Sequence, residues 1–239
     1  MGSIGSNLQE VKRRIALACE ASGRSVDSVT LLAVSKTFGA DAVREAFAAG
    51  ECRFGENYVL EGVAKIAALA DLRDRLEWHL IGPLQSNKAR LVAEQFDWVH
   101  SVDRLKIAQR LSELRPAHLP PLQVCLQVNI SGEASKRGLR PDEVPAVAQA
   151  VAVLPRLLLR GLMAIPEPAQ DFAAQRTPHR ALHVLWQSLR TSGLALDTLS
   201  MGMSADLEAA IAEGATMVRI GSAIFGARPP IKPAADRPA

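Results

Sequence analysis

Eight short apolar runs, rich in β-branched residues, alternate with amphipathic segments along nearly the whole chain. Runs of this length are typical of buried strands, and the segments between them repeat apolar residues at helical spacing. The expected strands are Thr30–Val34, Cys52–Phe54, Glu77–Ile81, Trp98–Ser101, Gln123–Asn129, Leu158–Met163, Thr198–Met201 and Met217–Ile220. Regular alternation of strands and helices indicates an α/β protein with a parallel sheet.

Eight such units close most naturally into a single (β/α)8 barrel of the TIM type. The length of 239 residues is close to that of such a barrel. We expect the barrel to span residues 7–228, opening with a helix over Asn7–Ala21, after a flexible start at 1–6 and before a loose, Pro-rich tail at 229–239. An open doubly wound sheet is the alternative, but its typical GxGxxG turn does not follow the first strand.

Residues that begin and end helices recur between the expected strands. Asp41 is expected to open a helix that Gly50 closes, and Ser204 one that Gly214 closes. Asp103 is expected to cap the helix that follows the fourth strand. These signals support one strand and one helix per repeat.

Composition argues against several classes of function. The 28 basic and 25 acidic side chains leave a formal net charge of only +3, and no Lys/Arg cluster is long enough to line a nucleic acid. Cys19, Cys52 and Cys125 are widely spaced, so neither a disulfide framework nor a metal site is expected. We expect a cytoplasmic protein without membrane contact, because no signal peptide and no apolar run of about 20 residues is found.

A lysine lies where a barrel of this type carries its chemistry, at the carboxyl end of a strand. Lys36 follows the first strand, where desolvation can lower a lysine pKa and allow the amine to form an imine with an aldehyde. A solvated lysine at a strand end is the alternative, and position alone favours it.

The loops after the seventh and eighth strands favour an anion site. They read MGMS over residues 201–204 and IGSA over residues 220–223, so glycines admit an anion to backbone N–H groups and serines add hydroxyl donors. A helix cap and a turn residue are the simpler interpretations of the serine and the glycine. Opposite Lys36, the two loops predict a site for a phosphorylated aldehyde, unless Asp206 and Glu208 weaken it by pointing toward the anion.

Three further residues lie within or just after strands. Arg219 precedes Gly221 by two residues, so alternation places both on one side of the strand, either the barrel interior or the helix-facing side. Asn57 can line the mouth or cap a loop. For His79, inside the third strand, a hydrogen-bonded core role is more common than catalysis.

Five motifs, in order along the chain, resemble those of the pyridoxal phosphate homeostasis proteins. They are AVSKT at 33–37, FGENY at 54–58, WHLIGPLQSNK at 78–88, SMGMS at 200–204 and VRIGSAIFG at 218–226. The resemblance covers about residues 7–228. It implies the barrel of the alanine racemase N-terminal domain, without that enzyme's second, β-rich domain, and pyridoxal 5′-phosphate as the cofactor.

The resemblance also implies which residues surround the cofactor. The implied set is Lys36, Asn57, His79, Met201, Ser204, Arg219, Gly221 and Ser222. In this set Lys36 carries the imine and Arg219 approaches the pyridine nitrogen, while Ser204, Gly221 and Ser222 hold the phosphate. No catalytic residue is assigned.

The chain departs from the family pattern at two places. Many members have Lys-Pro where this chain has Phe38-Gly39, which removes a second lysine near the site, and Ser222 replaces a common threonine while keeping the hydroxyl. Lys136, in a loop after the fifth strand bounded by glycines, can supply a second amine, although a solvated loop lysine is the alternative.

The expected function is a monomeric carrier that buffers pyridoxal phosphate and delivers it to apo-enzymes that require it. A monodomain amino-acid racemase is the alternative, but racemisation requires acid–base groups on both faces of the substrate. The only tyrosine, Tyr58, is expected to have a packing or loop role, and no second domain is expected. A Schiff-base aldolase is the third hypothesis, and it is weakened because the sixth strand ends in Met163 and Ala164 without a lysine.

Overall fold

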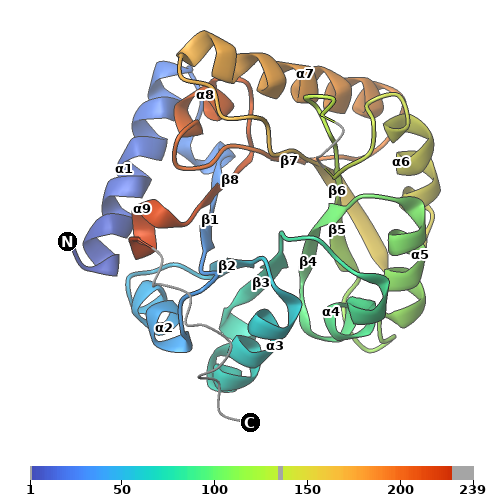
Figure 1. Cartoon of the computed structure of the whole chain (residues 1–239), viewed down its shortest axis with the longest axis horizontal. Coiled ribbons are helices and arrows are strands. Elements are labelled where there is room, and N and C mark those ends of the chain that lie inside the picture. The colour runs from blue at the N-terminus through green and yellow to red at the C-terminus, as the bar shows by residue number, and fades with distance from the viewer. Residues whose placement is uncertain (1, 134–136, 228–239) are drawn as a thin grey trace.

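The computed structural model describes residues 2–133 and 137–227, and within them eight parallel strands form a closed barrel (Figure 1). Each strand pairs with the next along the chain, and β8 pairs with β1. The strands are β1 Thr30–Val34, β2 Arg53–Glu56, β3 Glu77–Leu80, β4 Trp98–Val102, β5 Leu122–Gln127, β6 Leu157–Met163, β7 Thr198–Ser200 and β8 Met217–Ile220. The predicted (β/α)8 barrel is confirmed.

Helices surround the strands on the outside of the barrel (Figure 1). They are α1 Ile4–Ala21, α2 Ala40–Ala48, α3 Val59–Ala68, α4 Ala89–Gln95, α5 Leu105–Leu114, α6 Val144–Ala152, α7 Phe172–Thr191, α8 Leu207–Ala212 and α9 Ser222–Phe225. Short 3₁₀ turns cover Val26–Ser28, Ala70–Arg75 and Ser86–Lys88. No helix of the described part of the chain is long and apolar enough to cross a membrane.

The first helix begins earlier than the sequence indicates. Ser3 caps α1 by accepting a hydrogen bond from the Ser6 N–H at 3.2 Å, so the helix starts at Ile4 and not at Asn7. Residues 4–6, expected in a flexible start, therefore belong to the helix. The expected loose tail, 229–239, lies outside the described residues.

Two other helices begin later than expected. Arg104 is the N-cap residue of α5, and the Asp103 carboxylate instead pairs with the Arg104 side chain at 2.6 Å. Asp206, and not Ser204, is the N-cap residue of α8. The glycine expected to end α8, Gly214, does follow its last turn, with a φ of 92° that a residue with a side chain rarely adopts.

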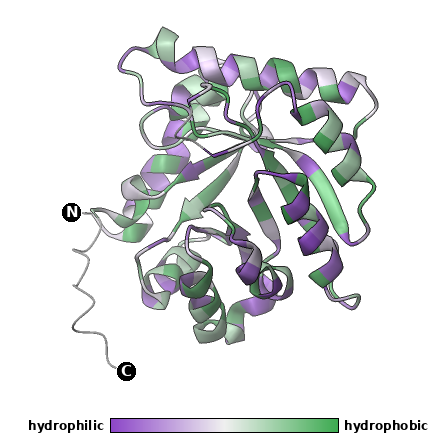
Figure 2. Ribbon diagram, turned by 45° about the vertical axis from the view of Figure 1, so that its right-hand side comes forward, coloured by the Kyte–Doolittle hydropathy of each residue, from purple (hydrophilic) through white to green (hydrophobic). Residues whose placement is uncertain are grey.

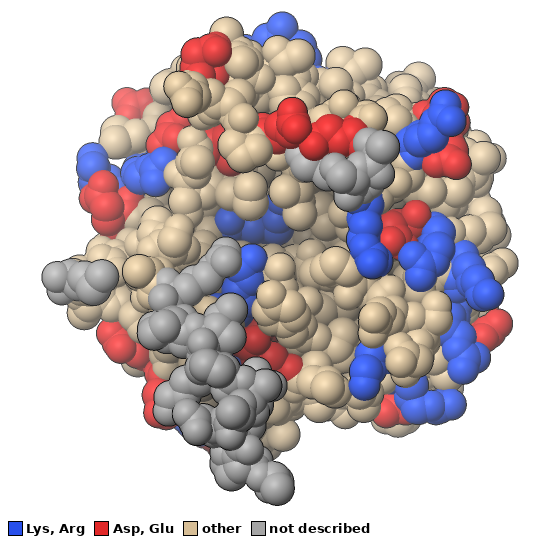
Figure 3. Space-filling model, viewed as in Figure 1, with Lys and Arg blue, Asp and Glu red and all other residues tan. Residues whose placement is uncertain are grey.

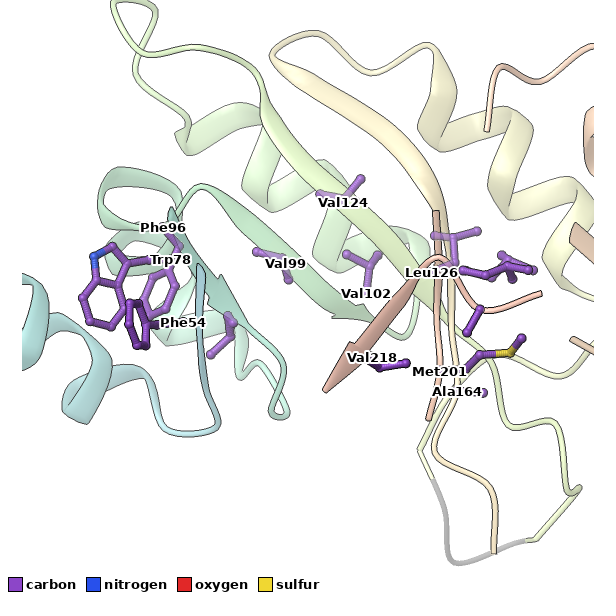
Figure 4. Close-up of a cluster of buried hydrophobic side chains, with 14 of the residues drawn as sticks. Phe54, Trp78, Phe96, Val99, Val102, Val124, Leu126, Ala164, Met201 and Val218 are labelled. Atoms are coloured by element: carbon purple, nitrogen blue, oxygen red, sulfur yellow. The ribbon is translucent and has the colours of Figure 1, made fainter. Parts of the chain in front are cut away.

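The outer faces of the strands and the inner faces of the helices form the main hydrophobic core. Phe54, Trp78 and Phe96 are fully buried in it and lie together in Figure 4. In Figure 2, hydrophobic and hydrophilic residues alternate along the surrounding helices, as expected for helices with one face on a barrel. Truncating one of these aromatic side chains to alanine typically costs about 3 to 5 kcal/mol.

The inner faces of the strands form a separate, smaller set of contacts. Leu32 of β1 and Ile81, just after β3, meet across the barrel side of β2. They can do so because the strand between them has Gly55, where an added Cβ would lie 3.3 Å from both side chains. A second inner cluster joins Trp98, Cys125 and Met163 from three consecutive strands. The interior of the barrel is thus filled by side chains, so a ligand site is expected at the mouth of the barrel.

Candidate functional site

A pocket of about 300 Å³ opens at the carboxyl ends of the strands. Its lining residues are Val34, Lys36, Phe38, Asn57, Ile81, Ile165, Met203, Ser204, Ala205, Arg219, Gly221, Ser222 and Gly226. Figure 3 looks onto this end of the barrel and shows basic side chains in the hollow at its centre. The volume is at the lower end of the range for small-molecule sites, about 300 to 1,000 Å³.

The pocket brings together most of the residues expected to bind a cofactor. Six of the eight line it: Lys36, Asn57, Ser204, Arg219, Gly221 and Ser222. They come from loops or strand ends that are up to 186 positions apart in the sequence, so the closed barrel is what places them side by side. The structure also resolves the orientation of Arg219, which faces the barrel interior.

The loop that carries Lys36 has a constrained backbone. Thr37 has a φ of 70°, in the left-handed region that β-branched residues avoid. Its N–H donates a hydrogen bond to Glu61 Oε1 of α3 at 2.5 Å. On the other side of Lys36, Ser35 is fully buried and donates its hydroxyl proton to Glu56 Oε1 at 2.6 Å. Lys36 is therefore held between two residues that are each bound to a glutamate.

A second lysine joins these two glutamates. Lys65 Nζ donates to Glu56 Oε1, Glu61 Oε1 and the Ser35 carbonyl oxygen, each at 2.7 Å. Lys65 is 6% exposed and Glu56 is fully buried. Burial raises the pKa of Glu56, although the positive charge and hydrogen bond of Lys65 act in the opposite direction. This cluster lies behind the Lys36 loop and links β1, β2 and α3.

Arg219 is anchored from within the barrel. Its Nη1 donates to the carbonyl oxygen and the hydroxyl of Ser200 at 2.6 and 2.8 Å, and its Nη2 donates to the Ala164 carbonyl oxygen at 2.9 Å. Burial lowers the pKa of Arg219 to about 10, so the guanidinium stays charged at neutral pH. The pocket thus contains a fixed positive charge whose N–H groups can only donate.

Two carboxylates near the loop that follows β7, those of Asp206 and Glu208, have partners within the protein. Asp206 Oδ1 accepts the Met203 N–H at 2.7 Å and its Oδ2 lies 2.8 Å from His179 Nε2. Burial alone would raise the pKa of Asp206, but the hydrogen bonds from His179 and Met203 outweigh it and lower the pKa. Glu208 forms an ion pair with Arg14 at 2.8 Å. Both negative charges are therefore partly compensated within the protein.

Glycines give the loops after β7 and β8 their tight geometry. At Gly202, φ is 93° and an added Cβ would lie 2.5 Å from Ala210 Cβ, so both the backbone and the contact with α8 require glycine. At Gly221, an added Cβ would lie 3.1 Å from the Val34 carbonyl oxygen, where β8 meets β1. The backbone of both loops can therefore approach a ligand closely.

Two of the implied cofactor residues do not line the pocket. Met201 is fully buried and lies with Ala164 and Val218 in the main hydrophobic core (Figure 4). Strand alternation explains this position, because the preceding Ser200 faces the interior. His79 does face the interior, but it lies one step below Ile81, is fully buried, and bonds to other side chains of the barrel. The interpretation of His79 as a hydrogen-bonded core residue agrees with this position.

The sequence interpretation also missed part of the pocket wall. Phe38, Ile81, Ile165 and Met203 give the pocket an apolar side. Their positions just after strands were the available signal, but apolar residues at strand ends are too common to stand out. Lys136 lies outside the described residues. Within residues 2–133 and 137–227, no group of three or more His, Cys, Asp or Glu side chains is arranged to hold a metal ion.

The sequence profile of the alanine racemase N-terminal domain matches residues 6–229. The pyridoxal phosphate homeostasis protein of Pseudomonas aeruginosa is 63% identical over 228 residues, which are 95% of this chain and 97% of that protein. The chain belongs to the pyridoxal phosphate homeostasis protein family. The family resemblance inferred from the five sequence motifs is therefore confirmed.

Solved structures place the family's barrel among known folds. PipY of Synechococcus elongatus, solved with PLP bound, has a TM-score of 0.82 and 37% identity, covering 94% of this chain and all of that one. Alanine racemase of Clostridium difficile has a TM-score of 0.69 at 14% identity, and the match covers 92% of this chain but 57% of the racemase. The second similarity shows the shared barrel fold alone.

Proposed function

We propose that the protein binds pyridoxal 5′-phosphate at the mouth of the barrel, attached to Lys36, and buffers and delivers this cofactor. The observation that carries the proposal is that one pocket places Lys36 together with the serines of two glycine-containing loops, Ser204 and Ser222. The proposal is supported by relatives named for pyridoxal phosphate homeostasis and by a homologous structure with PLP bound.

The pocket fits such a ligand chemically. Asn57 Oδ1 is buried there, and none of the described residues donates a hydrogen bond to it, so a polar ligand can complete its hydrogen bonding. Arg219 supplies donors to a ring nitrogen that carries a lone pair. Phe38 and Ile165 offer apolar surface to the faces of a ring.

Pyridoxal 5′-phosphate supplies an aldehyde, which condenses reversibly with a lysine amine to an imine with loss of water. The residues of this chain then have separate tasks. Lys36 is the amine, and the hydrogen bonds of Ser35 and Thr37 hold its loop in place. Ser204, Gly221 and Ser222 bind the phosphate through hydroxyl and backbone donors. Arg219 disfavours a proton on the ring nitrogen, because two adjacent positive charges repel.

A carrier requires reversible attachment without further chemistry, and an unprotonated ring is a weaker electron sink for a carbanion. Tyr58 is 59% exposed and does not line the pocket. The expected loop role of this tyrosine agrees with that exposure, and the expected packing role does not.

We further propose that the carrier acts as a monomer in the cytoplasm and that its recipients are apo-enzymes that depend on pyridoxal phosphate.

Attachment to Lys36 is tested by reducing the loaded protein with borohydride and mapping the modified peptide by mass spectrometry. The label is expected on Lys36, and Lys36→Ala is expected to lose the visible absorption band of the bound cofactor. Lys106→Ala, on the exposed face of α5, is the control and should keep the band. Labelling of Lys65 alone, the other lysine near this loop, would contradict the assignment.

The carrier function is tested separately from binding. Loaded protein is incubated with L-alanine in deuterated water, and with an apo-enzyme whose activity reports cofactor transfer. We expect transfer to the apo-enzyme, and D-alanine formation far below about 1 per second, an ordinary enzymatic rate. Sustained D-alanine formation that is lost in Lys36→Ala would support the racemase instead.

A further inference from the structure

Five side chains form a continuous hydrogen-bonded chain through the barrel, from the pocket to its opposite end. Arg219 Nη1 lies 2.8 Å from Ser200 Oγ, which lies 2.8 Å from His100 Nδ1. His100 Nε2 lies 2.9 Å from His79 Nδ1, and His79 Nε2 lies 2.8 Å from Glu77 Oε1. The first four side chains are at most 3% exposed, whereas the Glu77 side chain is 35% exposed.

The chemistry of the two ends fixes the direction of every bond. A guanidinium can only donate, and an ionised carboxylate can only accept. Burial lowers the pKa of His79 and lowers that of His100 well below its usual value, which favours the neutral form of both imidazoles. Each neutral imidazole, and the Ser200 hydroxyl, then accepts one hydrogen bond and donates one. All protons therefore point away from the pocket, from Arg219 toward Glu77.

The geometry points to Ser200, His100 and His79 as positioning residues that fix the guanidinium of Arg219 toward the pocket. Because the Ser200 proton is committed to His100, the lone pairs of Ser200 Oγ are left for Arg219. Glu77 sets this polarity from the far end of the barrel.

The arrangement has a consequence for what the pocket accepts. With Nη1 on Ser200 and Nη2 on the Ala164 carbonyl oxygen, the guanidinium plane is fixed, and its remaining N–H groups are the donors available to a ligand. A bound ring must then present an acceptor at this point. This part rests on the proposed binding of pyridoxal phosphate, whereas the direction of the hydrogen bonds does not.

Charged groups around the far end act on both Glu77 and His79. Glu77 lies 3.4 Å from Arg53 Nε of β2, and this cation helps to keep the carboxylate ionised. Burial is the largest single influence on the pKa of Glu77 and would raise it, but the hydrogen bond from His79 and the nearby charges, Arg53 among them, together outweigh burial and lower the pKa. Asp97, which precedes β4, also acts on His79 and favours its charged form, but burial has the larger effect.

The direction is tested in cofactor-free protein by NMR of ¹⁵N-labelled histidine. Both His79 and His100 are expected as neutral imidazoles with the proton on Nε2 near neutral pH. The opposite arrangement would put a second proton on His79 and the His100 proton on Nδ1. Observation of that tautomer of His100, or of a charged imidazole at either position, would overturn the inferred polarity.

The positioning role is tested with pyridoxal phosphate as the probe. Ser200→Ala and His100→Gln are expected to weaken its binding about tenfold and to shift the pH profile of its visible band. The first substitution removes an acceptor of Arg219, and the second removes the imidazole that fixes the Ser200 hydroxyl. Ser200→Thr keeps the hydroxyl and should restore both properties. The exposed His118→Gln is the control. Folded Ser200→Ala and His100→Gln with unchanged affinity and pH profile would refute positioning, and failure of the unmodified protein to bind would refute the proposed function alone.

Discussion

Lys65→Met removes the ammonium group that holds Glu56, Glu61 and the Ser35 carbonyl oxygen together, and it keeps a side chain of similar length. Each of the two carboxylate contacts is 2.7 Å long. At an effective dielectric constant of about 20, one such contact is worth about 6 kcal/mol before the cost of desolvation. Because desolvation offsets much of that attraction, loss of one partner of a buried pair typically costs about 3 to 5 kcal/mol.

Thermal and urea denaturation of the cofactor-free protein measure this loss. For a chain of this size, 3 to 5 kcal/mol is expected to lower the melting temperature by about 6 °C or more. Arg44→Met, which removes a cation from the exposed pair with Asp71, is the matched control and should change neither curve measurably. Equal effects of the two substitutions would refute the reasoning that burial makes the Lys65 cluster important.

The same substitution has a defined pH dependence. Burial already raises the pKa of Glu56, and loss of the Lys65 charge raises it further. A folded state with a raised carboxyl pKa binds its proton more tightly than the unfolded state, so stability falls as the pH rises through that range. Lys65→Met should therefore differ more from the unmodified protein at pH 8 than at pH 5. A difference that is constant with pH would exclude Glu56 as the group left uncompensated.

Two further predictions concern packing and cysteine reactivity. Gly161→Ala is expected to destabilise the fold by about 3 kcal/mol or more, because its Cβ would lie 1.7 Å from the Thr198 carbonyl oxygen. Gly39→Ala is the control: its Cβ would meet no atom within 4 Å, so it should be tolerated in the same denaturation assay. Alkylation of the folded protein should modify the exposed Cys52 but not the buried Cys125, whose thiol pKa is raised by burial to about 12; mass spectrometry would show labelled Cys125 if this were wrong.

The barrel and the ends of its strands were predictable because each buried strand is a short run of apolar residues that can be recognised in the sequence. The expected strands Thr30–Val34 and Met217–Ile220 match β1 and β8 residue for residue, and no other strand bound differs by more than two positions. Once eight units alternate, topology alone brings Lys36 and the loops of Ser204 and Ser222 to the same end. Strand alternation could not predict whether Arg219 faces the barrel interior or the helices. It shows which residues of a strand share a face, but not which face is the interior.

The polar network behind the site was not predictable in the same way. Lys65 lies on a helix and bonds to residues 4, 9 and 30 positions away, and the sequence gives no sign that its amine is buried. His79 and His100 form a hydrogen bond only because β3 and β4 lie side by side. Neither residue alone therefore predicts the row of hydrogen bonds through the barrel. Such contacts depend on packing between elements, and local patterns do not record them.

The proposed phosphate role of the Ser204 and Ser222 loops permits a final prediction, in which unphosphorylated pyridoxal is the control ligand. Ser204 and Ser222 line the pocket from the loops after β7 and β8, and each hydrogen bond from a hydroxyl to a charged phosphate is worth about 1.5 to 3 kcal/mol. Ser204→Ala is therefore expected to weaken pyridoxal phosphate binding about tenfold or more, measured by titration of the visible band, while binding of unphosphorylated pyridoxal hardly changes.

Arg14 is also expected to affect binding of the phosphorylated ligand. Its ion pair with Glu208 compensates a negative charge on α8, beside the Ser204 loop. Arg14→Met leaves the Glu208 carboxylate uncompensated, so pyridoxal phosphate should bind more weakly, and the loss should be larger at low salt than at high salt. Arg14→Met with Glu208→Gln removes both charges and should restore the affinity. If Ser204→Ala weakened the phosphorylated and unphosphorylated ligands equally, these loops would serve the shape of the pocket and not the phosphate.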